Sequence, residues 1–309
     1  MEGAKTVKSK ILSLIISIAT IFTLTACNTN TTQDDGKLQI VTTLFPQYDF
    51  VRAITGENSD ITLLLTPGAE SHSYEPSATD ISKIQQADLF IYNGGESEVW
   101  VNKMLESAGD VETLRLLDFI TPLENHDDDH EHDSEYDEHI FTSLKNAVIM
   151  LDAVNDSICS IDSENASFYN QNTEKYKSEL MKLDNDFSEM ISTAKHKNII
   201  LADRNPFRYF ANDYGLEIQA SFTGCSHDTE ASPATVSELI GKVQENAIPI
   251  VFHIEFSSKK IADKISSATG AKTELLHSCH NISKEDFENN VTYLELMKNN
   301  YEVLSEALN

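Results

Sequence analysis

The chain has 309 residues, and its 50 acidic side chains outnumber 23 basic ones, which gives a formal net charge of −27. Such an acidic surface repels nucleic acid and anionic headgroups and concentrates cations nearby, so we expect no nucleic-acid partner. The length is sufficient for two lobes that each have a core.

Residues 1–26 have the features of a secretory signal peptide. A basic start (Lys5, Lys8 and Lys10) precedes the apolar run 11–26, which is shorter than the roughly 20 residues of a membrane-spanning helix. Leu24-Thr25-Ala26-Cys27 resembles a bacterial lipobox, so we expect lipid on Cys27. Residues 27–37 would then tether the folded chain to the outer face of the membrane.

Residues 38–162 are predicted to form an N-terminal lobe in which strands and helices alternate. This alternation predicts a mostly parallel sheet that is covered on both faces. Strand-like segments are expected at 38–44, 61–65, 88–95 and 113–118, and helices at 46–56, 78–87 and 96–109.

The stretch NHDDDHEHDSEYDEH at 125–139 has no apolar periodicity, which predicts a solvated acidic loop over 125–138. Acidic tracts rich in histidine bind divalent metals. We expect His139 to enter a metal site, while His126, His130 and His132 form an accessory site that collects metal.

A long helix over 163–195 is predicted to join this lobe to a C-terminal lobe at 196–309. Its apolar stripe runs through Leu180, Leu183, Phe187 and Ile191 at steps of three and four. The C-terminal lobe is expected to have strands at 198–203, 216–222, 248–256 and 271–278, and helices at 206–215, 232–246, 257–270 and 286–309. The predicted fold class is α/β, with two lobes joined by one stiff helix.

Side chains that suit a metal follow the carboxyl ends of several predicted strands, where open α/β sheets bind their ligands. A cleft lined by imidazole and carboxylate groups suits a divalent transition metal. The candidates from both lobes are His72, His139, Asp203, Cys225, His227, Glu230, His277 and His280. By contrast, His196 is expected in a solvent-exposed turn, and His253 and Cys159 are expected to be buried.

The segment TPGAESHSYEPSATDISKIQQADLFIYNGGESEVW resembles one that is characteristic of the metal-binding lipoproteins of zinc and manganese ABC transporters, cluster A-I or solute-binding protein family 9. YLELMKNNYEVLSEALN is similar to the closing helix of that family, and the acidic loop is similar to the loop of its zinc-type members. The resemblance covers the whole chain after the signal peptide. It implies two Rossmann-like lobes joined by a rigid helix, and delivery of metal to a membrane permease. We also expect a monomer.

The resemblance also implies a set of metal ligands. His72 and His139 match the first two ligand histidines, although Phe141, Thr142 and Ser143 replace the usual residues after the second. The third ligand position holds Arg204, whose guanidinium does not deprotonate and so cannot bind a metal. The fourth falls at about His280 or Asn281, and we expect His280 to bind. Water could fill the remaining position, and the candidates for a direct or supporting role are Glu230, Asp203, His227, His277, Cys225 and Cys279.

Two cysteines leave alternatives open. Cys225 and Cys279 follow different strands of the C-terminal lobe, and outside the cell they could form a disulfide. As thiolates they would instead favour zinc or another soft metal, and they could also remain free thiols. The excess of histidine favours zinc as cargo over manganese, which prefers carboxylate oxygen.

We therefore expect an extracytoplasmic binding protein that delivers zinc to an ABC permease, and not an enzyme. One alternative is an extracellular zinc hydrolase that uses a metal-activated water. The sequence contains no HExxH motif to support it. Another alternative is a metal-binding surface adhesin, for which the sequence offers no repeats.

Overall fold

The computed structural model describes residues 36–69, 74–124, 136–222 and 231–309. Leu38–Asn309 forms one compact unit. The predicted signal peptide and Cys27 lie outside the described residues. Within the described ranges, no helix combines the length and the apolar character that crossing a membrane requires.

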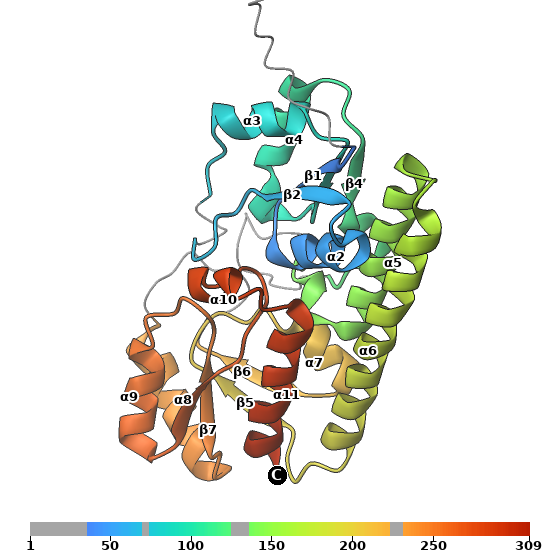
Figure 1. The fold of residues 1–309 in the computed structure, drawn as a ribbon. Helices are drawn as coiled ribbons and strands as arrows, with labels where there is room; N and C mark the ends of the chain where they lie inside the picture. The colour runs from blue at the N-terminus through green and yellow to red at the C-terminus, as the bar shows by residue number, and fades with distance from the viewer. Residues whose placement is uncertain (1–35, 70–73, 125–135, 223–230) are drawn as a thin grey trace, which may run out of the picture. The chain divides into compact units, whose positions relative to one another are not determined.

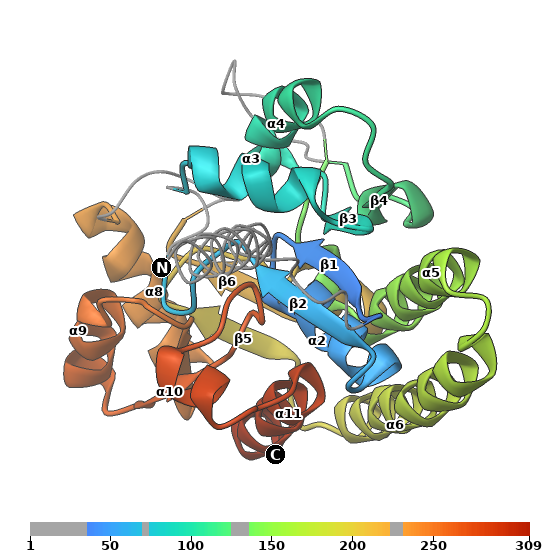
Figure 2. The same cartoon turned by 45° about the horizontal axis from the view of Figure 1, so that its top comes forward.

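The N-terminal sheet is parallel, with the strand order β2-β1-β3-β4. Its strands are β1 (Leu38–Thr42), β2 (Ser59–Leu63), β3 (Leu89–Tyr92) and β4 (Thr113–Arg115). Helix α2 (Phe45–Thr55) covers one face, and α3 (Ala78–Gln85) with α4 (Trp100–Ala108) covers the other (Figure 2). The strand expected at 113–118 ends early because Leu116–Phe119 turns into a 3-10 helix.

The C-terminal sheet repeats this topology with the order β6-β5-β7-β8, again with parallel strands. Its strands are β5 (Asn198–Leu201), β6 (Glu217–Ala220), β7 (Ile250–His253) and β8 (Lys272–Leu275). The helices that follow them are α7 (Arg208–Tyr214), α8 (Pro233–Glu245) and α9 (Lys260–Thr269). The predicted α/β class with two parallel sheets is confirmed.

Two long helices, rather than one, lie between the sheets in the chain. Helix α6 (Ala166–Ser192) falls within the predicted range, and α5 (Leu144–Ile161), which the sequence analysis missed, packs along it (Figure 1). The side chain of Ser143 caps α5 by accepting a hydrogen bond from the backbone of Asn146. The chain therefore passes from the first sheet to the second through a pair of helices.

The expected closing helix is broken into two. Helix α10 (Lys284–Glu288) ends before a turn, and α11 (Tyr293–Leu308) begins after it. Thr292 and Glu295 form a capping box, which satisfies the free N–H groups at the start of α11 and so fixes a new helix N-terminus there.

Both sheets turn one face toward a single shared core. Ile40 of β1 and Ile199 of β5 belong to the same apolar cluster, together with residues of α5, α6 and α11. The neighbouring residues Val41 and Ile200 point the other way, into separate outer clusters. The expectation that each lobe has its own core therefore holds only for the outer faces, because the inner faces pack into one cluster.

Three residues outside the site complete the comparison with the sequence predictions. His253 is buried at the end of β7, as predicted. His196 is half-buried rather than exposed, since it lies in the short connection between α6 and β5. Cys159 is also only half-buried, and its thiol donates to Asn155 on the preceding turn of α5.

Candidate metal centre

His139 lies at the start of a short 3-10 helix, Ile140–Thr142, with only 4% of its surface exposed. Asp137 holds the histidine twice: Oδ1 accepts the backbone N–H of His139 at 2.8 Å and lies 2.8 Å from Nδ1 of its ring. An ionised carboxylate only accepts hydrogen bonds, so Nδ1 carries the hydrogen. Nε2 is then the unprotonated ring nitrogen, and a carboxylate on the other nitrogen is the arrangement found behind metal-binding histidines.

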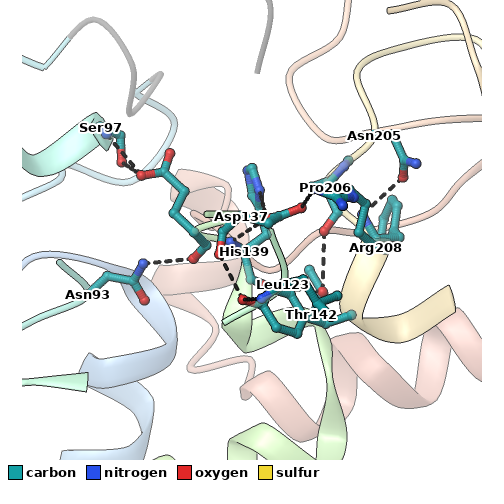
Figure 3. A network of polar contacts seen from close by, with 12 residues as sticks. Asn93, Ser97, Leu123, Asp137, His139, Thr142, Asn205, Pro206 and Arg208 are labelled. Atoms are coloured by element: carbon teal, nitrogen blue, oxygen red, sulfur yellow. Dashed lines mark hydrogen bonds and ion pairs between the residues drawn. The ribbon is translucent and has the colours of Figure 1, made fainter. Parts of the chain in front are cut away.

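Asp137 is suited to remain ionised. Burial raises the pKa of its carboxyl, but the hydrogen bonds from the ring and the backbone of His139, together with the nearby charge of Arg208, outweigh burial and hold that pKa below its ordinary value. Arg208 Nη1 lies 3.6 Å from Asp137 Oδ2, and the hydroxyl of Tyr209 donates to the Asp137 carbonyl at 2.9 Å. Both residues belong to α7, so the C-terminal half holds the segment that bears His139 (Figure 3).

The residue before His139 is fastened to the turn that follows β3. Glu138 Oε2 accepts hydrogen bonds from the backbone and the hydroxyl of Ser97, at 2.9 and 3.0 Å. Asn93 donates to the Glu138 carbonyl at 2.8 Å (Figure 3). A Cβ added at Gly95 would lie 2.0 Å from Glu138 Oε2, so only glycine allows this close approach. The Asn93–Ser97 turn thereby sets the position of the loop that carries His139.

His280 reaches the same place from the C-terminal half. It follows β8 and is 8% exposed, and its ring centre lies 5.7 Å from that of His139, with the rings nearly perpendicular. Two imidazoles that bind one tetrahedral zinc have ring centres roughly 5 Å apart. Phe141 packs against His280, with ring centres 5.1 Å apart. The structure thus brings together two of the three predicted ligand histidines in a geometry close to that of a shared metal ion.

His277 and Cys279 are not arranged as ligands. The Nδ1 atom of His277 accepts the backbone N–H of Cys279 at 2.9 Å, so the ring is neutral with its hydrogen on Nε2, and neither nitrogen is available to a metal. For the same reason the 3.8 Å separation of Nδ1 from Glu255 is not an ion pair. Cys279 is a free thiol without exposed surface, and burial raises its pKa well above the ordinary value. Of the alternatives for this cysteine, the structure therefore shows a neutral thiol and not a disulfide.

Asp203 has a local partner. Its Oδ1 accepts the backbone N–H of Arg204 at 3.0 Å, and its carbonyl accepts the N–H of Ser221. Its role as a ligand or a supporting group remains a prediction. Among the described residues, no group of three or more His, Cys, Asp or Glu side chains is placed to hold a metal. The remaining predicted site residues lie outside the described residues: His72, His126, His130, His132, Cys225, His227 and Glu230.

Asn281, next to His280, links the two halves. Its side-chain amide donates to the carbonyls of Thr66 and Ala69, at 3.0 and 2.8 Å, and Gly68 N–H donates to the Ile282 carbonyl at 2.8 Å. Asn281 is 2% exposed, so these bonds are shielded from water. The loop that bears His280 is therefore bonded directly to the loop 66–69.

Sequence reasoning missed the residues that hold the histidines in place. The spacing Asp-x-His in Asp137–His139 is a recognisable signal, because a carboxylate two residues from a histidine can reach its ring. Asn281 and Glu138 gave no such signal, since their partners are far away in the chain.

Known proteins resemble this chain in sequence and in fold. The family model described as zinc-uptake complex component A, periplasmic (ZnuA), matches residues 40–307. The zinc-binding lipoprotein AdcA of Streptococcus pneumoniae is 33% identical over 96% of this chain, which spans 61% of the length of that protein. The high-affinity zinc uptake system protein ZnuA of Bacillus subtilis is 31% identical, with 96% of this chain and 97% of that protein covered. The Zn(II)-bound ZnuA-like domain of S. pneumoniae AdcA superposes with a TM-score of 0.76 at 31% identity, over 88% of this chain and 99% of that one.

Proposed function

The chain belongs to the family of periplasmic zinc-uptake component A, and from that premise we propose that it captures Zn²⁺ outside the cytoplasm and passes it to the permease of an ABC importer. The family is a substrate-binding component of uptake systems, so the chain is not an enzyme. The observation that carries the proposal is the pair His139 and His280, which meet from the two halves of the unit with Asp137 behind the first.

In this proposal His139 and His280 bind the metal directly, and His72 completes a set of three histidines. Three neutral imidazoles form a site that favours zinc over manganese, which prefers more oxygen ligands. Arg204 occupies the position of the third family ligand and cannot replace it, so water or a carboxylate such as Glu230 or Asp203 takes the fourth position.

The same proposal extends to the ends of the chain and to the acidic loop. Lipid on Cys27 anchors a monomer to the outer face of the cell membrane, and 27–37 is its tether. His126, His130 and His132 form a weak collecting site that raises the concentration of zinc near His139. If deletion of 125–135 left the rates of zinc capture and transfer unchanged, the loop would be only a linker.

A competition titration with a chromophoric chelator tests the proposal. The full-length protein is expected to bind one equivalent of zinc tightly and manganese more weakly. His72→Ala and His280→Ala should each weaken zinc binding by about a hundredfold or more, because each removes a direct ligand. His196→Ala, which removes a half-buried histidine between α6 and β5, is the matched control. Tight binding that survives His280→Ala would reject the site.

A further inference from the structure

We propose that Glu255 is a positioning residue for metal binding. Its carboxylate accepts two hydrogen bonds from Ser278 and thereby fixes the backbone at His280. The inference rests on the proposed function, because His280 is taken as a zinc ligand. Glu255 lies just after β7, whereas Ser278 and His280 follow β8, so the contact joins the ends of two neighbouring strands.

The contacts form an unbroken path from the carboxylate to the ligand. Glu255 Oε2 accepts the backbone N–H of Ser278 at 2.8 Å, and Oε1 accepts the Ser278 hydroxyl. The hydroxyl oxygen of Ser278 in turn accepts the backbone N–H of His280 at 3.2 Å. The Glu255 side chain is 8% exposed and Ser278 is 3% exposed, so water does not readily replace these bonds.

The loop requires these hydrogen bonds because the backbone conformation of Cys279 is unfavourable. Cys279, between Ser278 and His280, has a φ of 65°, in the left-handed region that residues with a Cβ rarely adopt. Such a conformation persists only where the surroundings determine it, and it is found at ligand sites. If the loop relaxed, the residue that would move next is His280.

Two further side chains hold the other end of the same turn. Asn300 of α11 accepts the His277 N–H and donates to the His277 carbonyl, both at 2.8 Å. His277 Nδ1 accepts the Cys279 N–H. Asn300 therefore holds the beginning of the turn and His277 its middle, whereas the Ser278 side chain that Glu255 binds accepts the N–H of His280 itself. Glu255 is thus the group whose loss should affect the ligand most directly.

A similar pair of hydrogen bonds fixes the loop that bears His139. Glu138, which precedes His139, also binds both the N–H and the hydroxyl of one serine, Ser97. In each half of the unit a buried carboxylate and a serine thus join a histidine-bearing loop to the end of a neighbouring strand. This repetition supports a role in setting the distance between the two rings.

Four variants of the full-length protein test the proposal: Glu255→Ala, Glu255→Gln, Ser278→Ala and the double variant Glu255→Ala/Ser278→Ala. Zinc affinity is measured by chelator competition, and the visible absorption of bound Co²⁺ reports the ligand geometry. Outer partners of metal ligands typically contribute 10-fold to 100-fold in affinity. Glu255→Ala and Ser278→Ala should each weaken zinc binding by about tenfold and shift the Co²⁺ bands, and the double variant should lose little more than either, because both act along one path.

The conservative variant separates positioning from folding. Gln keeps the shape of the side chain and one acceptor oxygen, so Glu255→Gln should recover most of the affinity. Glu302→Gln, at an exposed position on α11, removes the same charge and should change nothing. Thermal unfolding of each metal-free variant identifies any that fails to fold. If Glu255→Ala does not fold, the zinc affinity of Ser278→Ala, which is the smallest change, decides whether the proposal holds.

The role of Glu255 would be overturned if folded Glu255→Ala and Ser278→Ala kept the zinc affinity and the Co²⁺ bands of the unaltered protein. If His280→Ala still weakened zinc binding in that case, the proposed site would stand without it. If His280→Ala also left binding unchanged, the proposed site would fail together with it.

Discussion

Replacement of Asn281 by Ala is predicted to accelerate zinc release. The side-chain amide donates two buried hydrogen bonds to Thr66 and Ala69 across the two halves of the unit, and Ala removes both. A hydrogen bond contributes about 0.5–1.5 kcal/mol net, so we expect a loss of about 2 kcal/mol from the closed arrangement. The hydrogen bond from Gly68 to Ile282 remains and keeps the loss from being larger.

This loss should appear in the dissociation rate. We expect zinc release to separate His139 from His280, and the hydrogen bonds of Asn281 to break in the same motion. A loss of about 2 kcal/mol corresponds to roughly thirtyfold in an equilibrium constant, and differences among variants of one site fall mostly in the off-rate. Stopped-flow transfer of zinc to an excess of chromophoric chelator measures that rate directly.

Two further variants sharpen the test. Asn281→Asp places a carboxylate against two carbonyl oxygens and should release zinc faster than Asn281→Ala. Asn289→Ala, at an exposed position just after α10, is the matched control and should leave the rate unchanged. A release rate in Asn281→Ala equal to that of the unaltered protein would refute the idea that these hydrogen bonds hold the metal site closed.

The remaining predictions concern Gly95, with Gly241 as its control, and Glu98. Gly95→Ala should push Glu138 aside and lower zinc affinity by about tenfold in the same titration, because the added Cβ would lie 2.0 Å from its carboxylate. Gly241→Ala is the control, because its added Cβ lies inside α8 and meets nothing within 4 Å. It should leave zinc affinity unchanged and raise the free energy of unfolding by about 0.5–1 kcal/mol. Equal zinc affinities of the two variants would contradict the role of Gly95. Burial raises the pKa of Glu98 to about 7, despite hydrogen bonds from Thr43 and Gly94 that lower it. The folded metal-free chain therefore binds a proton that the unfolded chain has lost, and its stability should fall by about 3 kcal/mol as pH rises from about 4.5 to 7. In Glu98→Gln, the free energy of unfolding measured with urea should depend less on pH over this range than in the unaltered protein. The same pH dependence in both proteins would show that Glu98 is ionised in the folded chain.

The sequence predicted those features that depend on local periodicity and strand order. Alternation of strands and helices was sufficient to expect parallel sheets, and the carboxyl ends of their strands led to His139 and His280. Helix α5 has the same kind of signal, with Leu144, Leu151 and Ile158 at steps of seven, but it directly follows the acidic loop and was missed.

Other features depend on contacts that no local pattern contains. Periodicity shows that Ile40 and Ile199 lie on apolar faces, but it does not show that both faces pack into one core. The same holds for Glu255 and Ser278, which are 23 positions apart, and for Asn281 and Thr66, which are 215 apart. Of the alternatives left open for Cys279, the structure shows a free thiol, and the sequence could not select among them because the burial of this residue depends on contacts that are distant in the chain.

The most direct test of the central claim is anomalous diffraction at the zinc absorption edge from crystals of the zinc-loaded protein. The proposed site requires one strong peak between the two halves of the unit, about 2.0–2.1 Å from a ring nitrogen of His139 and of His280. A peak that lies elsewhere, or one bound by only one of these histidines, would contradict it.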